Sequence, residues 1–134
     1  MQDILVPISP GELLDKITIL RIKSRRMTDE PKLRNVRAEL EQLERTWRAS
    51  GCARPEVVSD EVALTRVNTE LWDIEDQIRA KELANSFDAG FISLARAVYV
   101  TNDERAAIKK RVNVLLGSRI VEEKSYQPYR PADR

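Results

Sequence analysis

Residues that interrupt helices are few in this chain and lie far apart, and this spacing limits what it can fold into. The 134 residues include only four glycines and six prolines. Between these residues lie long stretches rich in Leu, Ala, Glu, Lys and Arg, all of which favour the helix. We therefore expect an all-α fold, an antiparallel bundle of four main helices with short links between neighbours.

The first half of the chain predicts two helices with clear boundaries. In the first, Ser9 occupies the N-cap, Pro10 follows, and Glu12 stands three residues after the cap. In this pattern the Ser and Glu side chains satisfy each other's backbone amides. The segment Thr28–Pro31 ends this helix and caps the second, which runs from about Lys32 to Trp47. Apolar residues recur every three or four positions in both helices.

The second half predicts two more helices. The third follows a cap at Ser59–Asp60, and the fourth ends at Gly117, which can adopt the left-handed conformation of a helix stop. Thr101 and Glu104 repeat the capping pattern inside the fourth helix. A break in this helix near Asn102 is therefore an open alternative.

Outside the helices, the chain has one loop and two extended ends. We expect a single helical domain over residues 1–134, with a loop at about 50–60 and a C-terminal tail over 118–134. The segments Ile4–Val6 and Arg119–Val121 are β-prone and can pair as a short ribbon. The two tyrosines of the tail are expected to pack back on the bundle.

The composition excludes several catalytic centres. There is no histidine, so neither a Ser-His-Asp nor a Cys-His arrangement is available, and a metal site would lack imidazole ligands. Cys52 is the only cysteine, which excludes an internal disulfide. We name no catalytic residue and regard an enzyme as the less favoured class.

Charge and hydropathy exclude further partners. The 23 basic and 22 acidic side chains leave a net charge of +1, unlike a histone-type nucleic-acid binder. Few aromatic residues stand near the basic ones to stack bases. No stretch is apolar over the length of a membrane span or a signal peptide. We therefore expect no specific nucleic acid, no membrane and a cytoplasmic location.

A line of polar residues on the third helix is the main candidate for a binding face. Asn68, Trp72, Glu75, Arg79 and Glu82 follow one another at intervals of four, three, four and three residues, so they share one face. A Trp among an amide and charged groups suits a half-buried ligand pocket. The plainer alternative, which we favour, is a boundary stripe in which Glu75 and Arg79 form an ordinary surface pair.

If a pocket exists, it takes residues of both charge signs from three segments. Together with an aromatic wall and an amide, they suit a small anionic ligand. The candidates are Glu12, Asp15 and Lys16 from the first helix, Trp72, Glu75, Asp76 and Arg79 from the third, and Tyr99, Asn102 and Arg105 from the fourth segment. Arg105 also begins a polar line that continues through Lys109 and Asn113.

Carboxylates spaced three residues apart raise a second hypothesis, a magnesium site. Glu12 and Asp15 on the first helix, with Glu70 and Asp73 on the third, can present paired oxygens on facing helices, which suit Mg²⁺. Helical nucleotide pyrophosphohydrolases use such pairs. Any highly charged helical protein contains several by chance, however, so the signal is weak.

Charge is unevenly distributed along the chain. Eight basic residues lie between Lys16 and Arg37 against two acidic ones, and seven acidic residues lie between Glu56 and Asp76 against Arg66 alone. The two segments either neutralise each other by packing together or form an anion-binding surface. Because the third helix has two usable faces, we also expect a homodimer.

Several blocks cover most of the chain outside the loop. They are ISPGELLDKITILRIK (8–23), KLRNVRAEL (32–40), LWDIEDQIRAKE (71–82), and a C-terminal block with LAR, VY and TND in residues 94–103, LLGS (115–118) and EEKSY (122–126). Together they resemble a family of small bacterial proteins known only as a domain of unknown function. The resemblance implies a bacterial, cytosolic protein and carries no activity, cofactor or catalytic residue.

Three functional classes follow from the sequence. The leading hypothesis is a non-enzymatic binding or accessory module that uses a polar helix face. The first alternative is a Mg²⁺-dependent, hydrolase-like enzyme acting on phosphorylated small molecules, and only this hypothesis requires a cofactor. The second alternative is a structural interaction protein that acts through its dimer surface.

Overall fold

The protein is all-helical, as the sequence predicts. The computed structural model describes residues 1–130 and contains four α-helices joined by short links. The helices are α1 (Pro10–Arg26), α2 (Glu30–Ala49), α3 (Val58–Leu83) and α4 (Ala89–Leu115), and a single turn of 3-10 helix, η1 (Pro55–Val57), leads into α3.

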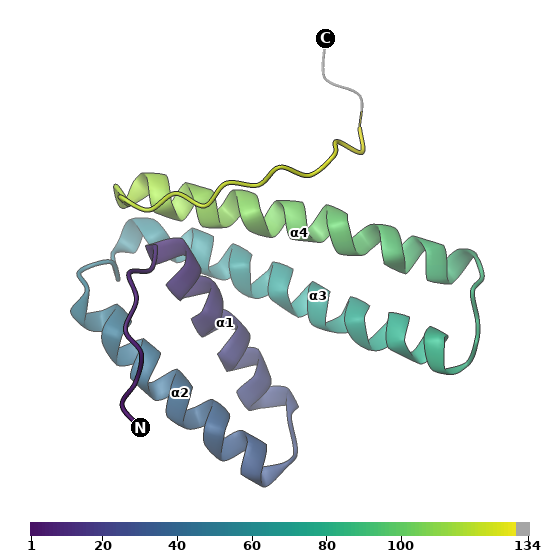
Figure 1. Ribbon diagram of the computed structural model, residues 1–134, viewed down its shortest axis with the longest axis horizontal. Helices are drawn as coiled ribbons and strands as arrows, with labels where there is room; N and C mark the ends of the chain where they lie inside the picture. The colour runs from purple at the N-terminus through teal and green to yellow at the C-terminus, as the bar shows by residue number, and fades with distance from the viewer. Residues whose placement is uncertain (131–134) are drawn as a thin grey trace.

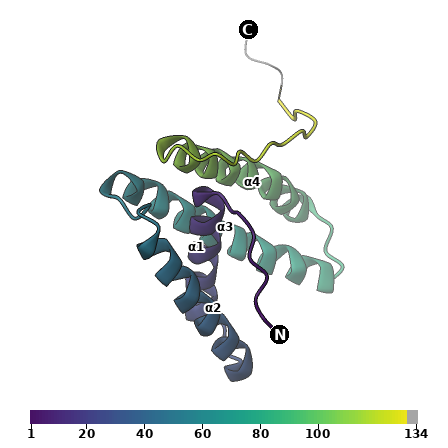
Figure 2. The same ribbon diagram turned by 60° about the vertical axis from the view of Figure 1, so that its left-hand side comes forward.

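The helices form two hairpins that pack on each other through α1. α3 and α4 run side by side in opposite directions, and α1 lies against both of them at one end of the pair (Figure 1). α2 packs on α1, away from the α3–α4 pair (Figure 2). The core lies where these elements meet, and its buried members are Leu13, Leu14, Ile17, Trp47, Val57, Leu64, Val67, Ile108 and Val112.

Local capping explains most helix boundaries, with two exceptions. The Ser9 hydroxyl accepts a hydrogen bond from the Glu12 amide at 3.2 Å, but the Glu12 carboxylate does not return the contact and pairs with Lys109 instead. The predicted cap at Ser59–Asp60 is wrong. α3 begins at Val58 and continues directly from η1, while the Asp60 carboxylate accepts hydrogen bonds from Arg111 at 3.1 Å.

α4 is one continuous helix, so the break considered near Asn102 does not occur. Thr101 and Glu104 do not cap a new helix because both side chains make other contacts. Thr101 is buried within the helix, and the Glu104 carboxylate pairs with Arg66 of α3. The predicted stop at Gly117 is confirmed, with φ of 65° and a hydrogen bond from the Ser118 amide to the Asn113 carbonyl at 2.8 Å.

The two ends of the chain do not pair, and residues 1–130 contain no β-strand. The N-terminal segment lies beside α2, where Asp3 accepts a hydrogen bond from Gln42 at 3.3 Å. The C-terminal tail instead runs back along α4 (Figure 1). The predicted ribbon is therefore wrong, because α1 and α4 lead the two ends to different sides of the molecule. No helix in the described part of the chain combines the length and apolarity needed to span a membrane.

Gly11 sets how closely α1 can approach α4. Its amide donates a hydrogen bond to Asn113 Oδ1 at 2.7 Å, and a Cβ atom at this position would overlap the Lys109 carbonyl oxygen. At Gly90, a Cβ atom would meet only side-chain atoms, of Lys81 and Asp88, at 3.2 Å and beyond.

We expect Gly11→Ala to lower the free energy of unfolding by about 1–3 kcal/mol, since the backbone of α4 must move to admit the methyl group. Gly90→Ala is the matched control, because it also replaces a glycine in the first turn of a helix. It is expected to stay within about 1 kcal/mol of the wild type. Denaturant unfolding of the two variants measures both values, and equal stabilities would contradict the close approach at Gly11.

Candidate functional site

A buried carboxylate, Asp15 of α1, joins three helices. Its Oδ1 atom accepts hydrogen bonds from Arg105 Nε of α4 and from Asn68 Nδ2 of α3, both at 2.9 Å. Its Oδ2 atom accepts a second bond from Arg105, so the guanidinium binds in a bidentate manner. Asn68 also donates to the hydroxyl of Thr18 at 2.9 Å. Both carboxylate oxygens of Asp15 therefore accept hydrogen bonds, from donors on α3 and α4.

Lys109, one turn after Arg105 on α4, links this cluster to the C-terminal tail. Its Nζ atom lies 2.5 Å from Glu12 Oε2, 3.9 Å from Asp15 Oδ2 and 3.2 Å from Glu122 Oε2. Glu12 and Asp15 come from the first turns of α1, whereas Glu122 comes from the tail. One ammonium group thus connects α1, α4 and the tail.

Both cations of the cluster remain charged. The hydrogen bonds from Arg105 to Asp15 raise the pKa of that guanidinium, although burial opposes the shift. Burial lowers the pKa of Lys109, but its hydrogen bond to Glu12 and the charges of Asp15 and Glu12 outweigh burial and raise the pKa. Both side chains are therefore protonated at neutral pH and hold the geometry of the cluster.

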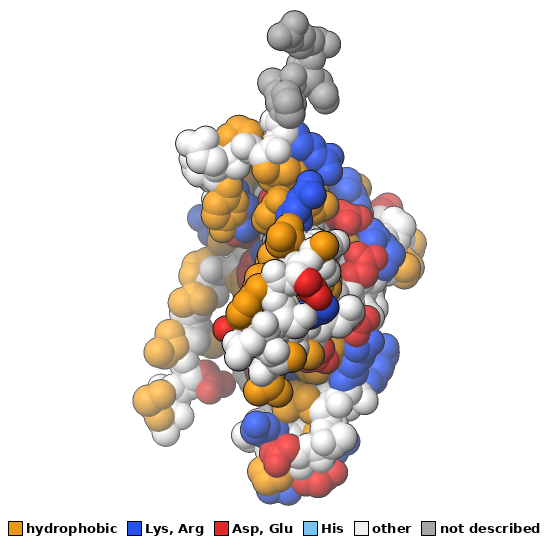
Figure 3. All heavy atoms as spheres, turned by 90° about the vertical axis from the view of Figure 1, so that its right-hand side faces the viewer, with side chains coloured by type: hydrophobic (Ala, Val, Ile, Leu, Met, Phe, Trp, Pro, Cys, Tyr) orange, Lys and Arg blue, Asp and Glu red, His pale blue; other side chains and the backbone are white. Residues whose placement is uncertain are grey.

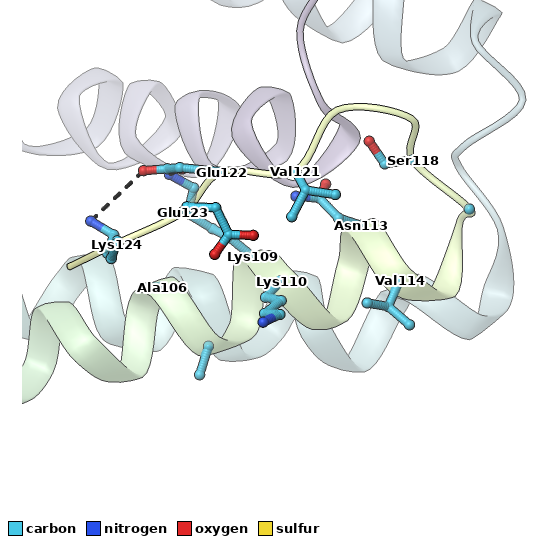
Figure 4. Close-up of a pocket in the computed structure, with 12 residues that line it drawn as sticks. Ala106, Lys109, Lys110, Asn113, Val114, Ser118, Val121, Glu122, Glu123 and Lys124 are labelled. Atoms are coloured by element: carbon cyan, nitrogen blue, oxygen red, sulfur yellow. Dashed lines mark ion pairs between the residues drawn. The ribbon is translucent and has the colours of Figure 1, made fainter.

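The tail covers α4 loosely and leaves two cavities beneath it. The first, of about 470 Å³, lies between the outer side of α4 at Lys109–Val114 and the tail residues Val121–Lys124 (Figure 4). The second, of about 630 Å³, lies further along α4 and is bounded by Tyr99, Asn102 and Arg105 on the helix and by residues 124–129 of the tail.

The second cavity has an aromatic wall. The rings of Tyr99 and Tyr129 lie with their centres 4.9 Å apart, and Tyr126 lines the same space. Burial raises the pKa of the Tyr129 hydroxyl, and the charge of nearby Asp103 raises it further. Lys124 Nζ lies 5.5 Å from the ring centre of Tyr126. Of the two tail tyrosines, Tyr129 thus packs back on α4 as the sequence predicts, whereas Tyr126 is 77% exposed and does not.

The structure brings together five of the predicted pocket residues. Glu12, Asp15 and Arg105 form the ion cluster, and Tyr99 and Asn102 line the second cavity beside Arg105.

The remaining predicted pocket residues lie elsewhere. Glu75 and Arg79 form a surface pair with an Nε–Oε2 distance of 3.2 Å, and the Arg79 side chain is 80% exposed. Lys16 and Asp76 are exposed, and Trp72 is half-buried. The four residues of α3 miss the cluster because α1 lies against only one end of the α3–α4 pair (Figure 1). Lys16 misses it because it is exposed on another side of α1 than Asp15.

The carboxylates considered for magnesium do not converge. Asp15 binds Arg105, Glu12 binds Lys109, Glu70 binds Arg66 at 2.9 Å, and Asp73 binds Arg26 at 2.5 Å. Within residues 1–130, no three carboxylate or cysteine side chains gather in a way that could bind a metal ion. Each of the four acidic groups instead neutralises a basic side chain.

Sequence reasoning missed part of the cluster. Lys109 stood on the polar line that begins at Arg105, and Asn68 stood on the polar line of α3, so the periodicity of both helices contained a usable signal. The role of Glu122 had no such signal, because it depends on the path of an extended tail.

We expect Asp15→Asn to destabilise the fold by about 3–5 kcal/mol, because it leaves the largely buried Arg105 without its counter-charge. Asp73→Asn is the matched control, since it also removes a carboxylate that binds an arginine, but from an exposed pair. Its cost should stay below about 1 kcal/mol. Thermal and denaturant unfolding of the two variants measure the difference, and similar losses would show that Asp15 has no special structural role.

Comparison with known proteins identifies a family but no activity. Residues 4–132 match a family of unknown function, DUF6165. No curated protein and no solved structure matches the chain. The match confirms the resemblance seen in the sequence blocks. Because it extends over nearly the whole sequence, the chain belongs to the DUF6165 family.

Proposed function

We propose that this protein is a non-enzymatic binding module that takes a small anionic ligand with a flat ring between α4 and the C-terminal tail. The observation that carries the proposal is the second cavity, where three tyrosines face the same space as Arg105 and Lys124. Its volume of about 630 Å³ is in the ordinary range of small-molecule sites.

One of the two cations that line the cavity, Arg105, is oriented before any ligand arrives. Asp15 binds Nε and Nη2 of Arg105, and Nη1 makes no hydrogen bond to any group in residues 1–130. Lys124 has only a long contact, 3.8 Å, with Glu122, and its side chain is 40% exposed. An anionic group can therefore bind both cations without displacing the buried carboxylate.

The aromatic side suits a planar group. Tyr126 is largely exposed in the structure, and Tyr99 and Tyr129 are about half exposed, so their rings retain free surface. Stacking of a flat ring on tyrosine is a common way to bind ligands that also carry charge. The combination favours a ligand with both a ring and a negative group over a simple inorganic anion.

A binding role fits the charge cluster better than catalysis does. Asp15 accepts three hydrogen bonds from charged or amide donors, which suits a group that positions its neighbours rather than one that accepts a proton. The carboxylates that the magnesium-dependent alternative needs are each paired with a cation. We therefore place the protein among binding or accessory modules.

The broader sequence expectations belong to this proposal as well. A bacterial, cytoplasmic protein is part of this proposal, and the resemblance of the sequence blocks supports it. A homodimer is also expected from the two faces of α3, and its interface is considered below.

Binding can be tested by thermal melting with matched probes. AMP carries both a ring and a phosphate, adenosine carries only the ring, and pyrophosphate carries only charge; aromatic carboxylates extend the panel. A true ligand at one hundred times its Kd stabilises the fold by about 2.7 kcal/mol. We expect at least one flat anion to raise Tm more than adenosine or pyrophosphate does.

Two variants test whether a ligand that raises Tm binds in the second cavity. Lys124→Ala and Tyr126→Ala should reduce it, whereas Lys32→Ala, which removes an exposed cation of α2, should not. Absence of a shift across the panel, or equal shifts in all three variants, would refute the proposed site.

The tail should open more easily when its ion pair is removed. Glu122→Gln weakens the contact with Lys109, so we expect trypsin to cleave after Lys124 several-fold faster, as a change of about 1 kcal/mol implies. Glu123→Gln is the matched control, because Glu123 is a neighbouring exposed carboxylate that forms no ion pair in the described part of the chain. Equal cleavage rates would mean that Glu122 does not fasten the tail.

A further inference from the structure

The outer half of the α3–α4 hairpin has no core of its own. Not one residue between positions 69 and 100 is buried, although this segment contains many large apolar side chains. Those that are only partly covered are Leu71, Trp72, Ile74, Ile78, Phe91, Leu94 and Val98. At the turn, Leu83 and Phe87 are 89% and 55% exposed. Figure 3, which faces this end of the molecule, shows apolar side chains interspersed with charged ones.

One side of the outer α3–α4 hairpin is covered by no other helix of residues 1–130, and it continues the side that α1 covers at the inner end (Figure 1). Asn68 of α3 and Arg105 of α4 both bind Asp15, and the outer half of the hairpin projects past the other two helices (Figures 1 and 2). Trp72, Glu75 and Arg79 follow Asn68 on the same side of α3. Val98, Leu94 and Phe91 lie at helical intervals from Arg105 on α4.

A pair of helices that covers its apolar side chains only in part is not stable by itself. Helices in proteins depend on packing of an apolar face against other elements, and two helices alone provide little of it. The smallest common arrangement that covers such a hairpin on one side is a four-helix bundle. A second helical hairpin of similar length would therefore bury the apolar side chains of the outer α3–α4 hairpin.

We propose that a second copy of this chain supplies that hairpin, so that two outer α3–α4 segments pack antiparallel about a two-fold axis. The charges on the face support this occupant. Glu75 and Arg79 stand one turn apart, and a two-fold axis at the level of position 77 sets each of them opposite its complement in the other copy. A membrane or a nucleic acid would require one sign of charge, whereas this face carries both.

This inference does not depend on the ligand cavity. It assigns the interface of the homodimer expected from the sequence to the outer α3–α4 hairpin. Glu75 and Arg79 pair with each other at 3.2 Å in the single chain, but they are 49% and 80% exposed, so the charges of a second copy can reach both. Asp76, Glu82 and Arg96 are also exposed and form no ion pair within residues 1–130.

Sedimentation velocity of the full chain, without added ligand, tests the interface. We expect the species at micromolar concentration to have twice the 15.4 kDa chain mass. Leu94→Glu places a charge on the face that the second copy would cover. This variant should sediment as the single chain. Ile92→Glu is the matched control, because Ile92 lies two residues away and is already 57% exposed on another side of α4. This control should remain dimeric.

A surface charge reversal keeps the test decisive if Leu94→Glu disturbs folding. Arg79→Glu should raise the Kd of the dimer about tenfold through two symmetric contacts, and the double variant Glu75→Arg/Arg79→Glu should restore it. Arg45→Glu removes an equivalent surface pair, with Glu41 on α2, and should change nothing. A wild type that stays at 15.4 kDa, or a dimer indifferent to both Leu94→Glu and Arg79→Glu, would overturn the inference.

Discussion

The bidentate contact between Asp15 and Arg105 is the interaction on which the rest of this structure depends. The two residues lie 90 positions apart, and their contact fixes α1 against α4, while Asn68 extends the same contact to α3. An ion pair in this position costs desolvation, and it is favourable only because Asp15 satisfies several donors at once. The approach of the helices that allows it requires a residue without a side chain at position 11, where α1 meets α4. Packing and electrostatics are therefore coupled at one end of the bundle.

The same cluster prepares the proposed binding site. Arg105 uses one edge of its guanidinium on Asp15 and borders the second cavity, so a structural contact also orients a group that can meet a ligand. Lys109 connects to the tail through Glu122 and so influences where the tail tyrosines lie. Residues 121–130 of the tail are all exposed and have few fixed contacts, which are the properties of a cover that can move. A binding role and a movable cover follow from one arrangement of charges.

The two ends of the molecule differ in how well their apolar side chains are buried. Near Asp15, three helices enclose apolar and polar groups alike, whereas the outer α3–α4 hairpin covers its apolar side chains only in part. Helix propensity and the well-capped turn at Asp88 support the hairpin locally, since the Asp88 carboxylate accepts a hydrogen bond from the Phe91 amide at 3.0 Å. Such local contacts do not cover apolar side chains. The dimer proposed above would complete the outer end in the way that α1 completes the inner one.

The sequence by itself determined the helices, because their signals are local. The caps at Ser9 and Asp29 and the stop at Gly117 act within a few residues, and apolar periodicity defines each helix between them. It did not distinguish Asn68 from Arg79, which lie on the same polar line of α3 at equivalent positions of the helix. Only the tertiary structure decided that one is buried against Asp15 and the other is exposed. The reason is that α1 crosses α3 at an angle, and the crossing point depends on contacts between residues far apart in the chain.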